Sequence, residues 1–153
     1  MKTLQQSMLL LGLVTGLAAG QTAGLTTGAI RIEALRVTEL EMRRQLASTT
    51  PATIDSLLAL YADSVVYEHP NAGAVVRGKD AMRHNMLQYI GSVRAVKVDP
   101  PRVTVGHDVA IVETNARMEI QDGGKWIPVV RHGLRVIEFN SRGLVRRLID
   151  YPW

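Results

Sequence analysis

The chain has 153 residues and a formal net charge of +4, and it contains no cysteine, which excludes disulfides and thiolate chemistry. Its length suits one domain with a real hydrophobic core. The basic residues are spread along the chain and are not interleaved with aromatic ones, so a nucleic-acid partner is not expected.

The N-terminal segment Met1–Gly20 has the pattern of a secretory signal peptide. Lys2 precedes the apolar run Met8–Ala19, and Ala18-Ala19-Gly20 supplies the small residues that a signal peptidase site requires. The run is too short for a transmembrane helix, which needs ~20 residues. We therefore expect a cleaved leader, a periplasmic or secreted bacterial protein, and no membrane association after cleavage. An uncleaved anchor is the alternative.

Three helices are predicted in the first half of the chain, after a flexible stretch over residues 21–28. The first helix spans Ile30–Leu46. Thr50 can cap the second helix, and Pro51 fits its first position. The third helix follows Gly78 and carries its apolar residues on one side.

The second half of the chain is rich in β-branched residues separated by turn signals. A first strand, Val65–His69, already precedes the third helix. The later predicted strands are Val93–Val98, Val103–Val105, Val109–Ile120, Trp126–Phe139 and Leu144–Trp153. Helices followed by a run of antiparallel strands indicate an α+β domain.

Alternation along the strands predicts which side chains face the helices. In Val109–Ile120 the inward set is Ala110, Val112, Thr114, Ala116, Met118 and Ile120. In the last strand, alternation alone does not decide between the face of Leu148 and Asp150 and the opposite face.

The strand Trp126–Phe139 is harder to orient. Leu134 and Val136 indicate an inner face that also contains His132, and Arg131 and Arg135 then point outward. Two large apolar residues at positions 137 and 139 favour the opposite orientation.

The run Tyr61–Pro70, followed by Arg77–Met82, resembles the core of the nuclear transport factor 2-like superfamily. The ending Gly143–Tyr151, with its Asp-Tyr pair, resembles the closing strand of that superfamily. Its members include ketosteroid isomerases, limonene epoxide hydrolases and SnoaL-like polyketide cyclases. The resemblance implies a cone-shaped, curved antiparallel or mixed sheet packed on three N-terminal helices (a cystatin-like α+β barrel), formed by residues 29–153.

Ketosteroid isomerases are the first relatives to compare. They have an Asp base just before the proline of the first strand, where this chain has His69. They also use a Tyr on the first helix, which is missing here, and a late Asp whose position falls near Arg135. Steroid isomerisation is therefore disfavoured.

Limonene epoxide hydrolases are the second family to compare. Their first-strand Tyr matches Tyr67 and their last-strand Asp matches Asp150, but His69 replaces their Asn. The Arg and Asp of their middle strand fall at Thr114 and Ala116. Epoxide hydrolysis is therefore disfavoured too.

SnoaL-like cyclases and scytalone dehydratases pair His with Asp or Tyr and shift protons next to a carbonyl. The matching candidates are His69, Asp150, Tyr67 and His132. The resemblance implies a cofactor-independent lyase or isomerase that acts on a small apolar carbonyl compound. His69 would be the base, Asp150 would orient it, and Tyr67 or His132 would stabilise negative charge.

Tyr89, Thr114, Met118 and Trp126 are expected to line the substrate site. The four histidines lack helical or strand ligand spacing, so neither a metal nor another cofactor is expected. The alternative is a non-catalytic domain that binds a small ligand or only dimerises, because an inward His is often simply hydrogen-bonded in a core.

A homodimer is expected through the outer face of the sheet. With the orientation above, that face carries the apolar residues Ile111, Val129, Ile137 and Phe139 among charged ones. A surface of this kind is apolar enough to pair with a second copy.

Overall fold

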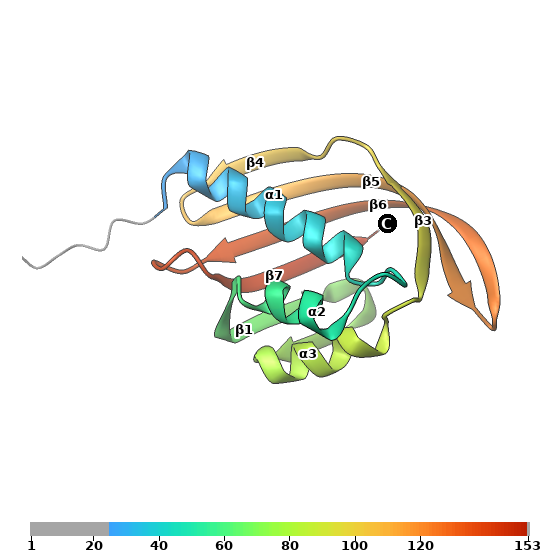
Figure 1. The fold of residues 1–153 in the computed structure, drawn as a ribbon. Coiled ribbons are helices and arrows are strands. Elements are labelled where there is room, and N and C mark those ends of the chain that lie inside the picture. Colours follow the sequence, from blue (N-terminus) through green and yellow to red (C-terminus); the bar gives the residue numbers. More distant parts are fainter. Residues whose placement is uncertain (1–24, 153) are drawn as a thin grey trace, which may run out of the picture.

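The computed structural model describes residues 25–152, which form three α-helices and one seven-stranded sheet (Figure 1). In chain order the elements are α1 (Thr27–Arg43), α2 (Pro51–Leu58), β1 (Tyr61–His69), a 3-10 turn (Pro70–Ala72), β2 (Ala74–Arg77), α3 (Lys79–Gln88), β3 (Val93–Val98), β4 (Arg102–Gly106), β5 (Val109–Asp122), β6 (Lys125–Phe139) and β7 (Val145–Pro152). The expected leader, Met1–Gly20, lies outside the described residues. α1 begins at Thr27, inside the stretch 21–28 that was expected to be flexible, and residues 21–24 of that stretch also lie outside the described residues.

The helix starts follow from their capping residues. Thr26 caps α1 by accepting a hydrogen bond from the backbone N–H of Ala29. Thr50 and Thr53 form a reciprocal capping box at the start of α2, and Pro51 occupies the first turn, where its missing N–H costs nothing. The predicted beginning of the second helix is confirmed.

The sheet is mixed, curved and not closed into a barrel. Its strand order is β2-β1-β7-β6-β5-β3, and β4 also pairs with β5. Only β1 and β7 run parallel among the described pairs; the others are antiparallel. Figure 1 shows the helices on one side of the bent sheet, with α1 against β4 and β5 and α3 near β1 and β2. The predicted α+β fold with a cone-like sheet on three helices is confirmed, whereas the short edge strand β2 was not predicted.

The main core lies at one end of the sheet, where the helices cover it. Its largest fully buried side chains are Tyr61, Phe139, Ile30, Ile54, Leu57, Ile137, Leu148, Val37, Val65, Val112 and Val145. Full burial of one large apolar side chain stabilises the fold by about 1.5–3 kcal/mol. The inward face predicted for β5 is confirmed, since Ala110, Val112, Ala116 and Met118 are all buried.

The orientation predicted for β6 is wrong. The hairpin between β5 and β6 turns through Gly123 and Gly124, both with positive φ, and Asp122 pairs with Lys125. This register places Arg131 opposite Ala116 and therefore on the inner face. The odd-numbered residues of β6 face the helices, and His132 lies on the outer face.

The same error affects the expected dimer surface. Ile137 and Phe139 are 0% and 2% exposed, so they belong to the core. Val129 packs against a smaller buried cluster that contains Ala116 and Met118. Of the four apolar residues proposed for that surface, Ile111 alone lies on the outer face, where it is 37% exposed.

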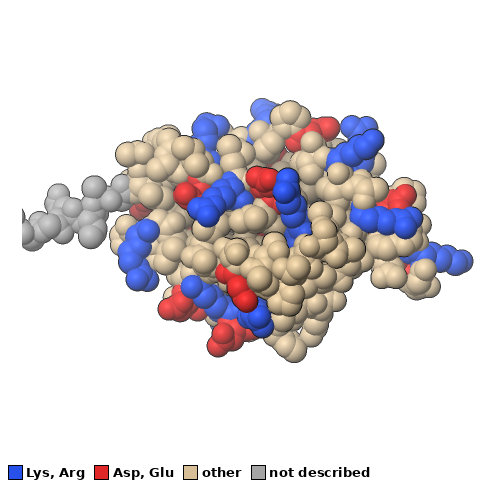
Figure 2. Space-filling model, in the orientation of Figure 1, with Lys and Arg blue, Asp and Glu red and all other residues tan. Residues whose placement is uncertain are grey.

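Exposed charges of both signs are interspersed on the face shown in Figure 2. One pair connects two helices: Arg83 Nε of α3 lies 2.6 Å from Asp55 Oδ1 of α2. Exposed pairs of this kind contribute little to stability, because solvent screens the two charges. The buried ion pairs lie instead between the helices and the inner face of the sheet.

Candidate functional site

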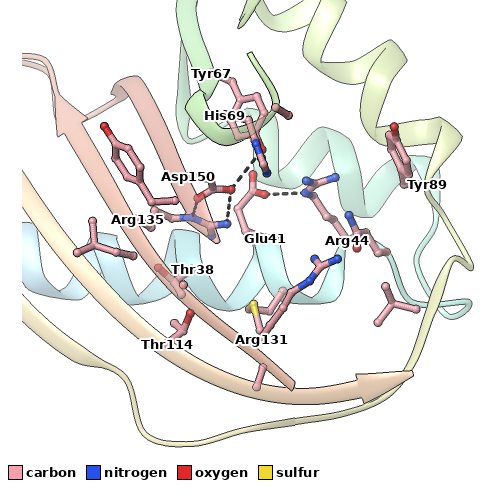
Figure 3. Close-up of a pocket in the computed structure, with 18 of the residues that line it drawn as sticks. Thr38, Glu41, Arg44, Tyr67, His69, Tyr89, Thr114, Arg131, Arg135 and Asp150 are labelled. Carbon is pink, nitrogen blue, oxygen red and sulfur yellow. Dashed lines mark hydrogen bonds and ion pairs between the residues drawn. The ribbon is translucent and has the colours of Figure 1, made fainter. Parts of the chain in front are cut away.

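A cavity of about 390 Å³ lies beyond the core, between α1, α3 and the inner face of the sheet. Figure 3 shows the side chains that line it, which come from elements far apart in the sequence. Its volume is in the range of small-molecule sites, ~300–1,000 Å³. The lining is mixed: apolar side chains cover part of the wall, and charged ones gather where the cavity meets the core.

At the floor, Asp150 and Arg135 form a buried bidentate ion pair. The two residues are register partners on β7 and β6, and their side chains are only 16% and 15% exposed. Arg135 Nε donates to Asp150 Oδ1 at 2.6 Å, and Nη2 donates to Oδ2 at 2.9 Å. The Tyr67 hydroxyl of β1 donates to Oδ2 at 3.3 Å. This arrangement fixes the carboxylate from three sides (Figure 3).

The charge states at the floor follow from this pairing. Burial alone would raise the pKa of Asp150, but the positive charge and hydrogen bonds of Arg135 more than offset it, so this pKa is lowered. Burial, followed by the negative charge of Asp150, raises the pKa of Tyr67. Asp150 is thus ionised and Tyr67 is neutral at physiological pH.

A second buried charge pair lies on α1. Arg44 Nε donates to Glu41 Oε2 at 2.6 Å, and the Tyr61 hydroxyl donates to Glu41 Oε1 at 2.6 Å. The Glu41 side chain is 1% exposed and that of Arg44 is 12% exposed. Burial alone would lower the pKa of Arg44, but the charge and hydrogen bond of Glu41 outweigh it and raise this pKa. Both carboxylates of the cavity are therefore neutralised by arginine.

His69 lines the cavity from the end of β1. It shares the inner face with Tyr67, two residues earlier, as the alternation predicted. In Figure 3 its ring points into the cavity that Asp150 and Glu41 also line. Between His69 and Asp150 the described contacts include no hydrogen bond, so the expected orienting role of Asp150 is not seen; Arg135 and Tyr67 hold this carboxylate instead.

Several buried polar atoms of the lining have no hydrogen-bond partner among the described residues. They are Arg44 Nη1, Arg135 Nη1, His69 Nδ1 and Thr38 Oγ1. An unpaired buried donor or acceptor costs about 1–3 kcal/mol. Four such atoms around one cavity are typical of a site that binds polar groups and not of a passive core.

Three of the four catalytic candidates come together, and one does not. Tyr67, His69 and Asp150 all line the cavity. His132 borders it through its position on β6, but its ring is exposed on the outer face and hydrogen-bonds Asn115 Oδ1 at 2.7 Å. The inward placement predicted for His132 is wrong for the reason already given, the hairpin register.

Three of the four residues expected to line the substrate site do so, and one does not. Tyr89, Thr114 and Met118 line the cavity, with Tyr89 46% exposed. Trp126 is not among the lining residues; the Arg94 guanidinium lies 4.3 Å from its ring centroid. Trp126 pairs with Gln121 near the hairpin turn, which keeps it away from the cavity.

Sequence reasoning missed the charged part of the site. The residues concerned are Glu41, Arg44, Arg131 and Arg135. For the two on β6 a signal was present: the sequence Asp122-Gly-Gly-Lys125 is typical of a two-residue hairpin, and such a turn sets the register of the whole pair.

The comparison with protein families now decides the relationship. The family model of the SnoaL-like domain matches residues 42–148, which is well over half of the chain. The chain belongs to the SnoaL-like domain family. No curated protein matches it significantly.

Solved structures share this SnoaL-like fold at low identity. A Bacillus subtilis protein assigned as an isomerase has a TM-score of 0.63 and 20% identity, covering 84% of this chain and 90% of that one. A Shewanella denitrificans OS-217 protein assigned as a SnoaL-like polyketide cyclase has a TM-score of 0.60 and 12% identity, covering 76% and 90%.

A third structure is the epoxide hydrolase/cyclase-like enzyme SalBIII, which has a role in pyran ring formation in the polyether salinomycin. Its TM-score is 0.59 at 14% identity, covering 82% of this chain and 91% of SalBIII. At these identities the three structures establish the fold alone. The activity of this SnoaL-like domain has to be inferred from the residues of its own cavity.

Within residues 25–152, no group of three or more His, Asp or Glu side chains is arranged to hold a metal ion. No helix in the same range has the length and apolar character needed to cross a membrane.

Proposed function

We propose that this SnoaL-like domain is a cofactor-independent lyase or isomerase that transfers a proton next to a carbonyl group, with His69 as the base. The observation that carries the proposal is the position of His69. Its imidazole lines the cavity beside two buried ion pairs, and its buried Nδ1 has no hydrogen-bond partner within residues 25–152. Histidine is the side chain best suited to exchange protons near neutral pH.

The charged groups near His69 have other roles than that of the base. Asp150, with its lowered pKa and its bonds to Arg135, is a poor base. His69 would take a proton from the carbon next to the carbonyl, and the electron pair would move towards the carbonyl oxygen to give an enolate. Arg44 and Arg135 each retain one unpaired N–H group, the kind of donor that stabilises such an oxygen.

Return of the proton from His69 to a different carbon would complete an isomerisation. This sequence of steps consumes no oxidant, reductant or metal, because one proton leaves the substrate and one returns to it. A lyase would differ in the second step, where the enolate expels a leaving group and His69 supplies the proton to it.

A non-catalytic ligand-binding domain is the second candidate. The observation in its favour is that Asp150 is fully engaged by Arg135 and Tyr67, so His69 has no carboxylate to orient it. In this case the unpaired donors would hold a ligand without chemistry.

The decisive experiment follows hydrogen–deuterium exchange at carbon. The probe is 4-phenylbutan-2-one in D₂O, with loss of its C3 proton signal measured by NMR. We expect catalysed exchange in the wild type and a decrease of ~10²–10⁴-fold in His69→Ala. His84→Ala, on the exposed surface of α3, is the matched control and should exchange like the wild type.

Equal exchange in His69→Ala and wild type would contradict the assignment of the base. No exchange in the wild type, together with a small molecule retained in native mass spectrometry, would favour the binding alternative. Thermal melts of both variants separate loss of chemistry from loss of fold.

We also propose that the domain works outside the cytoplasm, in the periplasm or the medium, and that it forms a homodimer. The first proposal is supported by the leader-like sequence Met1–Gly20. The second is supported by apolar residues on the outer face of the sheet, among them Ile111 and Val130, which are 37% and 63% exposed.

A further inference from the structure

The inner face of β6 presents two arginines with a glycine between them. Arg131, Gly133 and Arg135 are two residues apart, so they share the face that lines the cavity. Arg135 lies deepest and is paired with Asp150. Arg131 lies nearer the opening, and in Figure 3 its side chain extends into the cavity on the side where Glu41 and Arg44 lie.

Arg131 differs from the other two arginines in its contacts. Arg44 and Arg135 each have a carboxylate partner, Glu41 and Asp150. Arg131 has no hydrogen bond or ion pair with another residue in the described part of the chain. By contrast, Arg117 on the outer face of the adjacent strand β5 is paired with Asp99. The cation that faces the cavity is thus the one left without a counter-charge.

The charge balance of the lining gives the same result. The cavity has three arginines, Arg44, Arg131 and Arg135, against two carboxylates, Glu41 and Asp150, so the sum is 3 − 2 = +1. Both carboxylates are already satisfied by arginine and tyrosine donors. One positive charge, on the exposed side chain of Arg131, is therefore available to a ligand.

Gly133 places no side chain between the two arginines. A Cβ atom there would lie 3.3 Å from Thr114 Oγ1, which is a tight contact, so a glycine suits this position. Next to Gly133 the wall is apolar, since Ala116 and Met118 are buried side chains of the lining. The cavity thus combines one unmatched cation with an apolar wall.

We propose that the ligand of this cavity is a small amphipathic carboxylic acid whose carboxylate binds Arg131. The planar guanidinium group matches a carboxylate in bidentate geometry. The single excess charge suits a monoanion better than a doubly charged phosphate. The apolar body of the acid would lie over Gly133 against Ala116 and Met118, with its reactive end towards His69. This inference rests on the proposed function only in taking the cavity as the substrate site.

The test compares an acid with its neutral isostere. The probes are 4-phenylbutanoate and 4-phenylbutanamide, measured by isothermal titration calorimetry at low ionic strength. We expect the wild type to bind the acid at least tenfold more tightly than the amide. Arg131→Gln should reduce this preference to within about twofold, and Arg131→Lys should keep part of it, because charge remains but the bidentate geometry is lost.

Arg117→Gln is the matched control, because Arg117 is a strand arginine on the outer face, with a side chain 69% exposed. It should leave the preference unchanged. Equal binding of acid and amide by the wild type, no binding of the acid at millimolar concentration, or an unchanged preference in Arg131→Gln would overturn the proposal.

This outcome is separable from the test of the base. His69→Ala should lose proton exchange and keep the preference for the acid. Exchange without acid preference would overturn the ligand class alone, and acid preference without exchange would overturn the proposed catalysis alone.

Discussion

The floor of the cavity is held by two charge pairs whose partners are buried together. Arg135 neutralises Asp150, Arg44 neutralises Glu41, and each carboxylate also accepts a hydrogen bond from a tyrosine. Burying a charge is costly unless it is paired and hydrogen-bonded. We therefore read these four residues as a rigid support that sets the electrostatics around His69, and not as the proton carrier.

Replacing Asp150 tests this support. Asp150→Asn leaves Arg135 buried without its counter-charge, which should lower the free energy of unfolding by about 3–5 kcal/mol at neutral pH. Urea denaturation measures the loss. Asp55→Asn, which removes an exposed pair with Arg83, is the control and should leave the free energy of unfolding nearly unchanged, because solvent screens that pair.

The difference in unfolding free energy between wild type and Asp150→Asn should depend on pH, because the pKa of Asp150 is lowered in the folded protein. The unfolded carboxyl has an ordinary pKa of about 3.9, so its stabilising effect is complete above this value. It is lost as the pH falls through the lower folded pKa, where Asp150 becomes protonated in both states. The difference in unfolding free energy between wild type and Asp150→Asn should therefore shrink as the pH falls below the ordinary carboxyl pKa; a constant difference would show that charge pairing is not its cause.

At the scale of elements, the β5–β6 hairpin positions most of the cavity wall. Its two-residue turn, Gly123-Gly124, sets a register that runs without interruption from Asp122–Lys125 to Val109–Glu138. Because side chains alternate, this one turn decides that the odd-numbered residues of β6 face the helices. A shift by a single residue would exchange Arg131 and His132 between the two faces.

Gly133→Val tests the role of this strand in shaping the cavity. A valine should fill the space between the arginines and weaken binding of 4-phenylbutanoate at least tenfold. Stability should fall as well, because a Cβ atom here would lie only 3.3 Å from Thr114 Oγ1 and that side chain would have to shift. Calorimetry and thermal melts measure the two effects.

Asn115→Val is the matched control for that variant. It adds the same residue on the adjacent strand, but on the outer face, where Asn115 pairs with His132. Binding should be unaffected there. A Gly133→Val protein that binds the acid as well as the wild type would mean that the ligand does not lie over this strand.

At the scale of the whole molecule, the helices cover the inner face of the sheet and leave the outer face to solvent. Ile111 pairs across the strands with Val136 on that outer face, and Leu134 lies nearby. These apolar residues stand among charged ones such as Arg117 and Glu113. The outer face is the natural surface for contact between two copies.

We expect sedimentation velocity at micromolar concentration to show a dimer. Ile111→Arg should shift it towards monomer, because a charge would be placed in the apolar centre of the contact. Ile32→Arg is the control, since Ile32 is 65% exposed on α1, on the helical side of the molecule. A wild-type protein that sediments as a monomer would remove the dimer proposal.

Export is tested on the protein produced in a bacterial host. We expect the mature chain, recovered from the periplasm or medium, to begin at Gln21 by N-terminal sequencing. A cytoplasmic protein that still begins at Met1 would contradict the proposed leader and its cleavage.

The sequence determined features that depend on neighbouring residues. Thr50 and Pro51 predicted the start of α2, and period-two alternation placed Tyr67 and His69 on one face and oriented β5. These features rest on local backbone geometry, which a short stretch of sequence encodes. The family resemblance added the order of helices and strands, and with it the fold.

Only the tertiary structure decided which charges meet in the cavity. Tyr67 and Asp150 are 83 residues apart and touch because β1 and β7 pair in parallel. Tyr61 of β1 reaches Glu41, 20 residues earlier, because α1 lies across the inner face of the sheet. No local pattern marks such contacts, since each depends on the register of strands and the packing of a helix across them. Arg131 is the intermediate case: its face follows from the Gly123-Gly124 turn, but its lack of a counter-charge follows from the positions of every carboxylate around it.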